Sequence, residues 1–155
     1  MNSITKQIRN EKGSMITVVV MILALLTIVG IAAITTSNTE QQTATSEQIY
    51  KMAFFSAEAG RSYIEQNPNL YHEDNITTGG SLNFPDTADD TVNYNMWAQQ
   101  SFNGTVGYIG SSLPPRGSGY EVGTYKSHSY RVTSSGYGPR NSGTRVEAGF
   151  YRIGF

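Results

Sequence analysis

An uncharged apolar run from Met15 to Ile34 constrains this chain more than any other feature of its sequence. A helix over these 20 residues would be about 30 Å long, which matches the hydrocarbon thickness of a bilayer. Lys6, Arg9 and Lys12 precede the run, and such positive charges stay on the cytoplasmic side of a membrane. We therefore expect a single-pass inner-membrane segment whose N-terminus lies in the cytoplasm before any processing.

The same run argues against a cleaved secretory signal peptide. Such peptides have an apolar region of about 7–15 residues followed by a small-residue cleavage site. Here the run is longer, and the polar residues after Ile34 continue a helical pattern. A plain signal anchor that holds a C-terminal domain outside the membrane remains one interpretation.

Several short motifs carry a more specific resemblance. The leader sequence Glu11-Lys12-Gly13-Ser14-Met15 resembles the prepilin leader of type IV pilins and pseudopilins. Residues 25–31 and 57–60 are similar to the N-terminal domain of PilX-type minor pilins, and residues 130–138 resemble the C-terminal strands of that group. The second of these motifs consists of Ala57, Glu58, Ala59 and Gly60.

The resemblance implies how the chain is processed. A prepilin peptidase would cut between Gly13 and Ser14 and methylate the new N-terminus, leaving 142 of the 155 residues. The apolar segment would be kept and would pack in a filament with other minor and major pilins, assembled at an inner-membrane platform. Its packing residues would include Met15, Val18, Leu25, Leu26, Gly30 and Ile34.

Val18 is the one departure from the family pattern. In most pilins the fifth mature residue is a glutamate that neutralises the N-terminal amine of a neighbouring subunit, because an unpaired charge is costly in an apolar core. PilX-type pilins and the K-type pseudopilin of type II secretion commonly lack this glutamate. The valine at position 18 therefore predicts a minor subunit at or near the filament tip.

Composition excludes several other classes of function. After processing, the chain would carry eight cations against eleven carboxylates, a net charge of −3, with none of the cation clusters that nucleic-acid binding requires. The chain has no cysteine, which excludes disulfides, thiol catalysis and cysteine-ligated zinc. It also has no nucleophile elbow, P-loop or zinc-protease motif, so we expect no enzyme, no cofactor and no metal.

Helical periodicity continues beyond the apolar run, to about Gln66. Apolar and small residues recur every three to four positions, and Glu47 with Lys51 and Arg61 with Glu65 are spaced for ion pairs on the solvent side. Pro68 then stops the helix, since proline disfavours helix at the residue before it. We therefore expect a single helix over residues 14–66, whose packing face includes Ile49, Met52, Ala53, Gly60, Tyr63 and Ile64.

The remainder of the chain, rich in glycine and tyrosine, predicts a β domain. A loop-rich connector covers 67–92, and 92–102 is short helix or strand. Alternating residues then predict strands at 105–109, 120–125, 129–134 and 144–153, with a hairpin loop at 136–143. The expected fold is α+β and type IV pilin-like: a long N-terminal helix with a small C-terminal antiparallel sheet. Its domains are a leader (1–13), an apolar helix (14–36), an amphipathic continuation (37–66) and a globular β-rich part (67–155).

Other side chains are candidates for the core, the surface or a binding site. We expect Trp97 in the core and both histidines, His72 and His128, on the surface. An acidic loop with Asp86, Asp89 and Asp90 could bind calcium, but a solvated loop is the simpler interpretation. An adhesive aromatic surface and ordinary sheet composition both fit the tyrosines Tyr108, Tyr120, Tyr125 and Tyr137.

The favoured function is thus a minor pilin that contributes to initiation or tip assembly of a type IV pilus. The first alternative is a tip pseudopilin of a type II secretion system, which shares the leader, the retained helix and the motif at 57–60. A tip adhesin module is a third interpretation.

Overall fold

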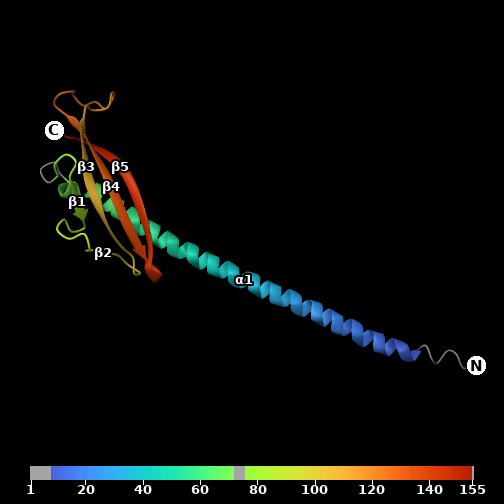
Figure 1. Cartoon of the computed structure of the whole chain (residues 1–155). Coiled ribbons are helices and arrows are strands. Elements are labelled where there is room, and N and C mark those ends of the chain that lie inside the picture. The colour runs from blue at the N-terminus through green and yellow to red at the C-terminus, as the bar shows by residue number, and fades with distance from the viewer. Residues whose placement is uncertain (1–7, 72–75, 155) are drawn as a thin grey trace, which may run out of the picture. The chain divides into compact units, whose positions relative to one another are not determined.

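The computed structural model describes residues 8–71 and 76–154. One helix, α1 (Ile8–Gln66), precedes all the strands: β1 (Ser81–Phe84), β2 (Tyr94–Asn95), β3 (Ser101–Ser112), β4 (Lys126–Gly138) and β5 (Ser142–Gly154). Two short 3-10 turns, η1 (Pro68–Leu70) and η2 (Pro139–Asn141), complete the described elements (Figure 1). This architecture confirms the expected α+β, type IV pilin-like fold.

The helix α1 ends where the sequence predicts and begins earlier. It starts at Ile8 rather than at Ser14, because the end of the leader has no proline and contains arginine, glutamate and lysine, which are good helix formers. At its other end, Asn67 donates its backbone N–H to the carbonyl of Ile64 and its side-chain amide to the carbonyl of Tyr63, at 3.1 and 2.7 Å. Pro68 then begins the turn η1.

The chain divides into two compact units, Met1–Thr45 and Ser46–Phe155. In the described part of the first unit, α1 is the sole element, and every residue from Gly13 to Ala44 is exposed. Its threonine hydroxyls donate within the helix: those of Thr17 and Thr27, for example, each bond to a backbone carbonyl four residues earlier, at 3.1 and 2.8 Å. Because of these internal bonds, the hydroxyls need no partner from outside the helix in an apolar segment.

In the second unit the strands form one antiparallel sheet of order β1-β3-β4-β5, with β2 also paired to β3. Three of the four predicted strands are confirmed, and each is longer than predicted. The strand predicted at 120–125 is wrong, because that segment forms a loop with a single bridge between Val122 and Tyr125. Within the connector and the ambiguous segment after it, the sequence reading missed β1 and β2 as distinct strands.

The connection between β4 and β5 is tighter than the predicted eight-residue loop. Strand pairing continues to Gly138 opposite Ser142, and Arg140 and Asn141 turn the chain with φ near +57° and +58°. These values belong to the mirror-image turn that suits the twist of a hairpin.

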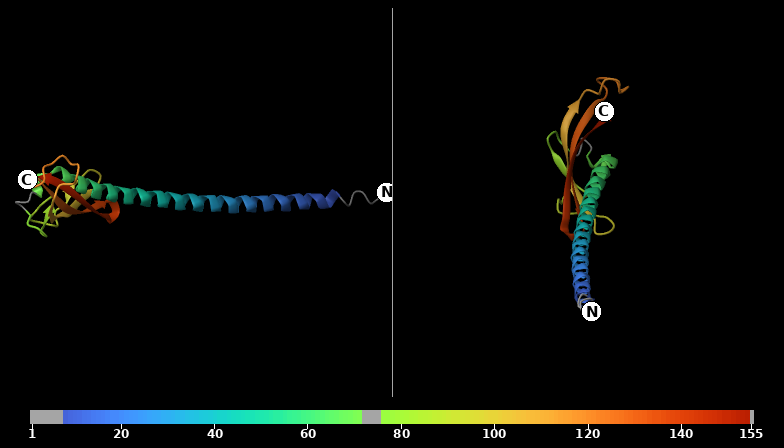
Figure 2. Two further views of the ribbon diagram at one scale, coloured as in Figure 1. Left: turned by 90° about the horizontal axis from the view of Figure 1, so that it is seen from above. Right: turned by 90° about the vertical axis from the view of Figure 1, so that its right-hand side faces the viewer.

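The core lies between one face of the sheet and the C-terminal part of α1 (Figure 2). Its buried residues are Ile64, Tyr71, Ile76, Phe84, Phe102, Val106, Tyr108, Tyr130 and Val132. Two burial predictions are wrong. Trp97 is 89% exposed in the tight turn between β2 and β3, and His128 is buried, with its Nδ1 3.0 Å from the hydroxyl of Tyr108. His72 lies outside the described residues.

Candidate functional site

The proposed processing junction lies in regular helix. Gly13 and Ser14 are both exposed, and the carbonyl of Gly13 accepts a hydrogen bond from the hydroxyl of Thr17. A side chain at position 13 would meet no atom of the chain within 4 Å. The structure therefore gives Gly13 no packing role of its own.

The apolar segment presents large side chains on all sides. The large packing residues named from the sequence are exposed to similar degrees, from 53% at Val18 to 73% at Met15, and Gly30 among them is exposed as well. This stretch lies in a helix long and apolar enough to cross a membrane by length and composition. A helix that is apolar all round requires lipid or other helices around it.

The motif at 57–60 forms a close seam between α1 and the sheet. Ala53 and Ala57 are fully buried, and they lie against Gly136 and Gly138 of β4. A methyl group at Gly136 would overlap the backbone of Ala53 and Ala57, and one at Gly60 would overlap the side chains of Phe102 and Ser134. Ala57 and Gly60 are therefore small because the backbones of helix and strand approach each other closely.

Glu58 points away from this seam and joins an ion-pair cluster. Arg61 donates to Glu58, with Nε 2.9 Å from Oε2, and also to Glu65. These two hydrogen bonds raise the pKa of Arg61 above its ordinary value, against a smaller opposing effect of burial. The predicted pairs Arg61–Glu65 and Glu47–Lys51 are both present, the latter at 3.7 Å.

The solvent face of α1 is less polar than the sequence suggests. Tyr50, Phe54 and Phe55 are 60, 36 and 63% exposed, and the rings of Phe54 and Phe55 pack edge to face. Their spacing (i, i+4, i+5) places the three side chains on one side of a helix. The sequence therefore contains the signal for this second apolar stripe beside the buried one.

The tyrosines do not form one adhesive surface. Tyr108 is buried in the core. Tyr120 and Tyr125 pack against each other just before β4 begins. Tyr137 lies at the other end of that strand, about 40 Å away at 3.3 Å per residue.

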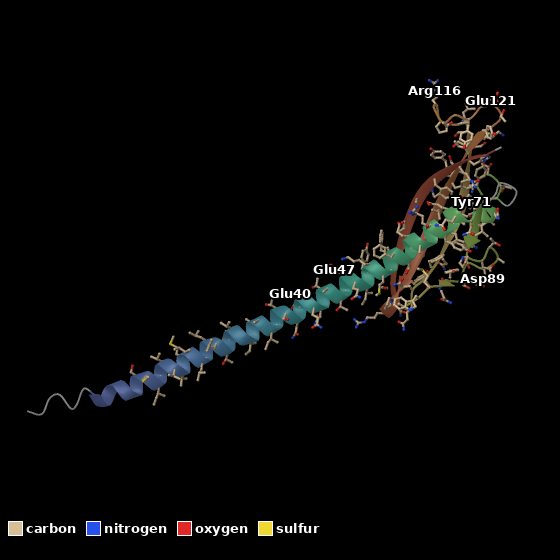
Figure 3. All side chains as sticks on the ribbon, turned by 180° about the vertical axis from the view of Figure 1, so that it is seen from behind. Glu40, Glu47, Tyr71, Asp89, Arg116 and Glu121 are labelled. Carbon is tan, nitrogen blue, oxygen red and sulfur yellow. The ribbon has the colours of Figure 1, made fainter. Side chains whose placement is uncertain are left out.

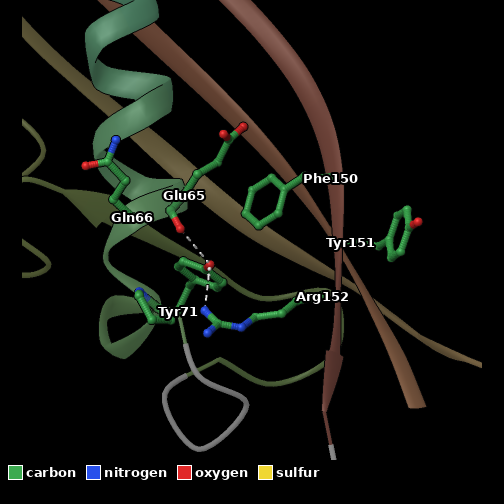
Figure 4. A pocket seen from close by; sticks show the side chains of 7 residues that line it. Glu65, Gln66, Tyr71, Phe150, Tyr151 and Arg152 are labelled. Atoms are coloured by element: carbon green, nitrogen blue, oxygen red, sulfur yellow. Dashed lines mark hydrogen bonds between the residues drawn. The ribbon is translucent and has the colours of Figure 1, made fainter. Parts of the chain in front are cut away.

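A shallow pocket of about 470 Å³ lies where α1 ends beside β5 (Figure 4). Tyr71 connects its two sides, because its hydroxyl donates to the carbonyl of Glu65 at 3.4 Å and accepts from Arg152 at 3.3 Å. The pocket lining is otherwise Gln66, Pro68, Phe150 and Tyr151. Among these residues no nucleophile is paired with a base, so the pocket does not indicate catalysis.

The acidic loop is a set of local turns. Asp86 accepts from the backbone N–H of Ala88 at 2.9 Å, and Asp89 accepts from the N–H and hydroxyl of Thr91 at 2.8 and 2.6 Å. The two bonds from Thr91, first the one from its hydroxyl and then the one from its backbone N–H, lower the pKa of Asp89 below its ordinary value. Within the described residues, no cluster of three or more metal-ligating side chains occurs.

Comparison with protein families decides the identity of the N-terminal part. Residues 12–60 match the family model described as PilX N-terminal. The chain carries a PilX N-terminal domain. No curated protein and no solved structure matches the chain.

The PilX N-terminal domain begins one residue before Gly13 and ends at Gly60, the last small residue of the motif that packs against the sheet. It covers less than half of the chain and lies entirely within α1. The match supports a relation of this part of the chain to type IV pilus-related pilins. The apolar segment inside the domain is consistent with a membrane anchor.

Proposed function

We propose that the chain is a minor subunit of a type IV pilus that acts in initiation or tip assembly of the filament. The observation that carries the proposal is the PilX N-terminal match over residues 12–60. It spans the leader glycine, the apolar segment and the seam motif in one continuous helix. In this proposal the subunit acts in filament assembly and not in catalysis.

The life cycle follows from the proposed domains. Prepilin peptidase removes residues 1–13 and methylates Ser14, while the apolar helix of residues 14–36 holds the subunit in the inner membrane with its leader in the cytoplasm. The continuation over 37–66 carries the globular part, 67–155, on the outer side. The inner-membrane platform then moves the subunit from the bilayer into the filament and to the cell surface.

Val18 supports a position at the tip. Its side chain is apolar and 53% exposed, so it offers no carboxylate to the N-terminal amine of an adjacent subunit. A subunit that lacks this carboxylate fits best where one neighbour is missing, because a buried amine without a counter-charge is costly.

Immunogold labelling of sheared filaments tests this position. An antibody against the exposed loop of residues 113–125 should place gold at one end of a filament, a few particles at most. Filaments from a strain that lacks the gene provide the background. Uniform labelling along the filament, or no label above background, would contradict the proposal.

A further inference from the structure

Strand β5 leaves one edge of the sheet open. It pairs with β4 over thirteen residues, from Ser142 to Gly154, and no other described strand lies on its outer side. Strands of five to six residues are typical, and a long open edge exposes backbone N–H and C=O groups to pairing with other chains. A stable subunit therefore gains from a partner that covers this edge.

The edge is also basic. Arg140, Arg145 and Arg152 are exposed along η2 and β5, and the one acidic residue there, Glu147, is paired with Arg131 at 3.2 Å. Within the part of the chain that the structure describes, Arg140 and Arg145 have no ion-pair partner. A hollow of about 220 Å³ adjoins Arg145 and is further lined by Ser135, Tyr137, Gly143 and Thr144.

The opposite edge of the sheet is acidic. Residues 85–93 connect β1 to β2, and both strands pair with β3 on the side away from β4. This segment contains Asp86, Asp89 and Asp90, all exposed, and no cation. Figure 3 shows Asp89 across the sheet from β5.

The acidic segment and Arg145 lie in one row of the sheet. The backbone carbonyl of Asp90 accepts a hydrogen bond from the side chain of Asn103 at 3.2 Å. Asn103 pairs with Ser135, and Ser135 pairs with Arg145. The two opposite charges are therefore at the same level along the strands, at the two ends of the row.

This arrangement suits a second copy placed side by side in the same orientation. Moving a copy along the row brings its acidic segment against Arg145 of the first copy, with no shift along the strands. Such a contact uses two different surfaces. By contrast, antiparallel pairing of two β5 edges about a two-fold axis would bring the exposed arginines of both copies onto one shared edge, where like charges repel.

We propose that the β5 edge at Arg140 and Arg145 binds the acidic segment 86–90 of a second copy of this chain. The inference rests on the proposed function, because it takes both copies to be inserted in one membrane with the same orientation. Complementary charges at such an edge mainly set orientation and choice of partner.

Cross-linking of full-length protein in intact envelopes tests the contact. The chain has no cysteine of its own, so Ala88→Cys in one tagged copy and Gly143→Cys in a second, differently tagged copy are the sole thiols. A short bis-maleimide should join the two tags. The matched control replaces Gly143→Cys by Gly149→Cys, which is also exposed on β5 and on the same face, about 20 Å further along the strand. We expect it to cross-link at least about fivefold less.

Charge exchange gives a second readout. Arg145→Asp in the copy with Gly143→Cys, or Asp90→Arg in the copy with Ala88→Cys, should lower the yield about fivefold, and both together should restore it. Blotting measures the amount of each subunit in the envelope and the removal of its leader. A lower yield of cross-linked product can then be distinguished from a lower amount of subunit.

Three results would overturn the contact: equal yields at positions 143 and 149, no response to charge reversal, or products that join Gly143→Cys to itself. A product of Ala88→Cys with another protein, without the two-tag product, would reject the second copy as the occupant. If gold still marks one end of the filament while the two-tag product is absent, this contact fails and the proposed function stands.

Discussion

At the scale of single residues, close packing between α1 and β4 depends on the absence of side chains. Gly136 faces the backbone of Ala53 and Ala57, and Gly60 faces Phe102 and Ser134. Backbone atoms cannot rotate away as a side chain can, so added atoms here must push helix and strand apart. The motif at 57–60 therefore fixes how the domain is held on its helix.

Replacing Gly136 with alanine should destabilise the fold by about 1–3 kcal/mol, the usual cost of overpacking. Gly149→Ala is the matched control on the neighbouring strand, because its methyl group would meet no atom closer than 3.8 Å and should change stability by less than about 0.5 kcal/mol. Unfolding of the full chain in detergent micelles, followed by near-ultraviolet circular dichroism, measures both. Equal stability of the two variants would contradict the close seam.

Trp97 is the sole tryptophan of the chain and is 89% exposed. Its fluorescence should therefore match that of a free tryptophan amide in the same buffer and be quenched by iodide. Trp97→Ala should change the free energy of unfolding by less than about 0.5 kcal/mol, because little buried surface is lost. A blue-shifted emission that resists quenching would show that the side chain is packed instead.

At the scale of elements, the sequence predicted most where a pattern is long. Apolar length and 3–4 residue spacing identify α1, and the proline at 68 marks its end within a residue. Alternation likewise identifies β3, β4 and β5. The strand predicted at 120–125 is wrong although its residues alternate as those of a strand do. Gly119 and Gly123 adopt positive φ values and bend this segment into a loop.

Burial was harder to predict than the elements. Trp97 is a large aromatic residue, which favours burial. However, Ala98 and Gln99 after it take φ values of 58° and 59°, and this tight turn leaves the indole exposed to solvent. No glycine or asparagine signals such a turn in the sequence. His128 is buried because its neighbours across the sheet bring it beside Tyr108, a pairing that local sequence does not reveal.

The turn at Asp89 in the acidic segment can be tested by its pH dependence. The bonds from Thr91 lower the pKa of Asp89 below its ordinary value of 3.8, so they stabilise the turn above that pH, and the effect is lost as pH falls through the folded-state pKa. Thr91→Ala removes the hydroxyl and should raise the titration midpoint of Asp89, measured by carbon NMR of its carboxyl group. Thr87→Ala is the control and should leave that midpoint unchanged. Equal midpoints in all three chains would contradict the turn.

At the scale of the whole molecule, the chain joins a domain with its own core to a helix that has none. The globular part buries a core that includes Phe84, Phe102 and Tyr130 between sheet and helix, whereas the apolar run of the first unit is exposed throughout. The physical chemistry of that run requires lipid or other helices around it. The proposed pilin function would meet this need, because a pilin subunit would be stored in a membrane and then packed in a filament, and the PilX N-terminal match includes the run.

The leader is the part of the account that one measurement tests most directly. N-terminal mass spectrometry of the protein from the cell envelope should find a chain that starts at a methylated Ser14 and contains 142 of the 155 residues. A Gly13→Asp variant, which alters the residue before the proposed cut, should retain the leader. An intact Met1 in the mature wild-type protein would contradict the pilin account and leave a signal-anchored envelope protein.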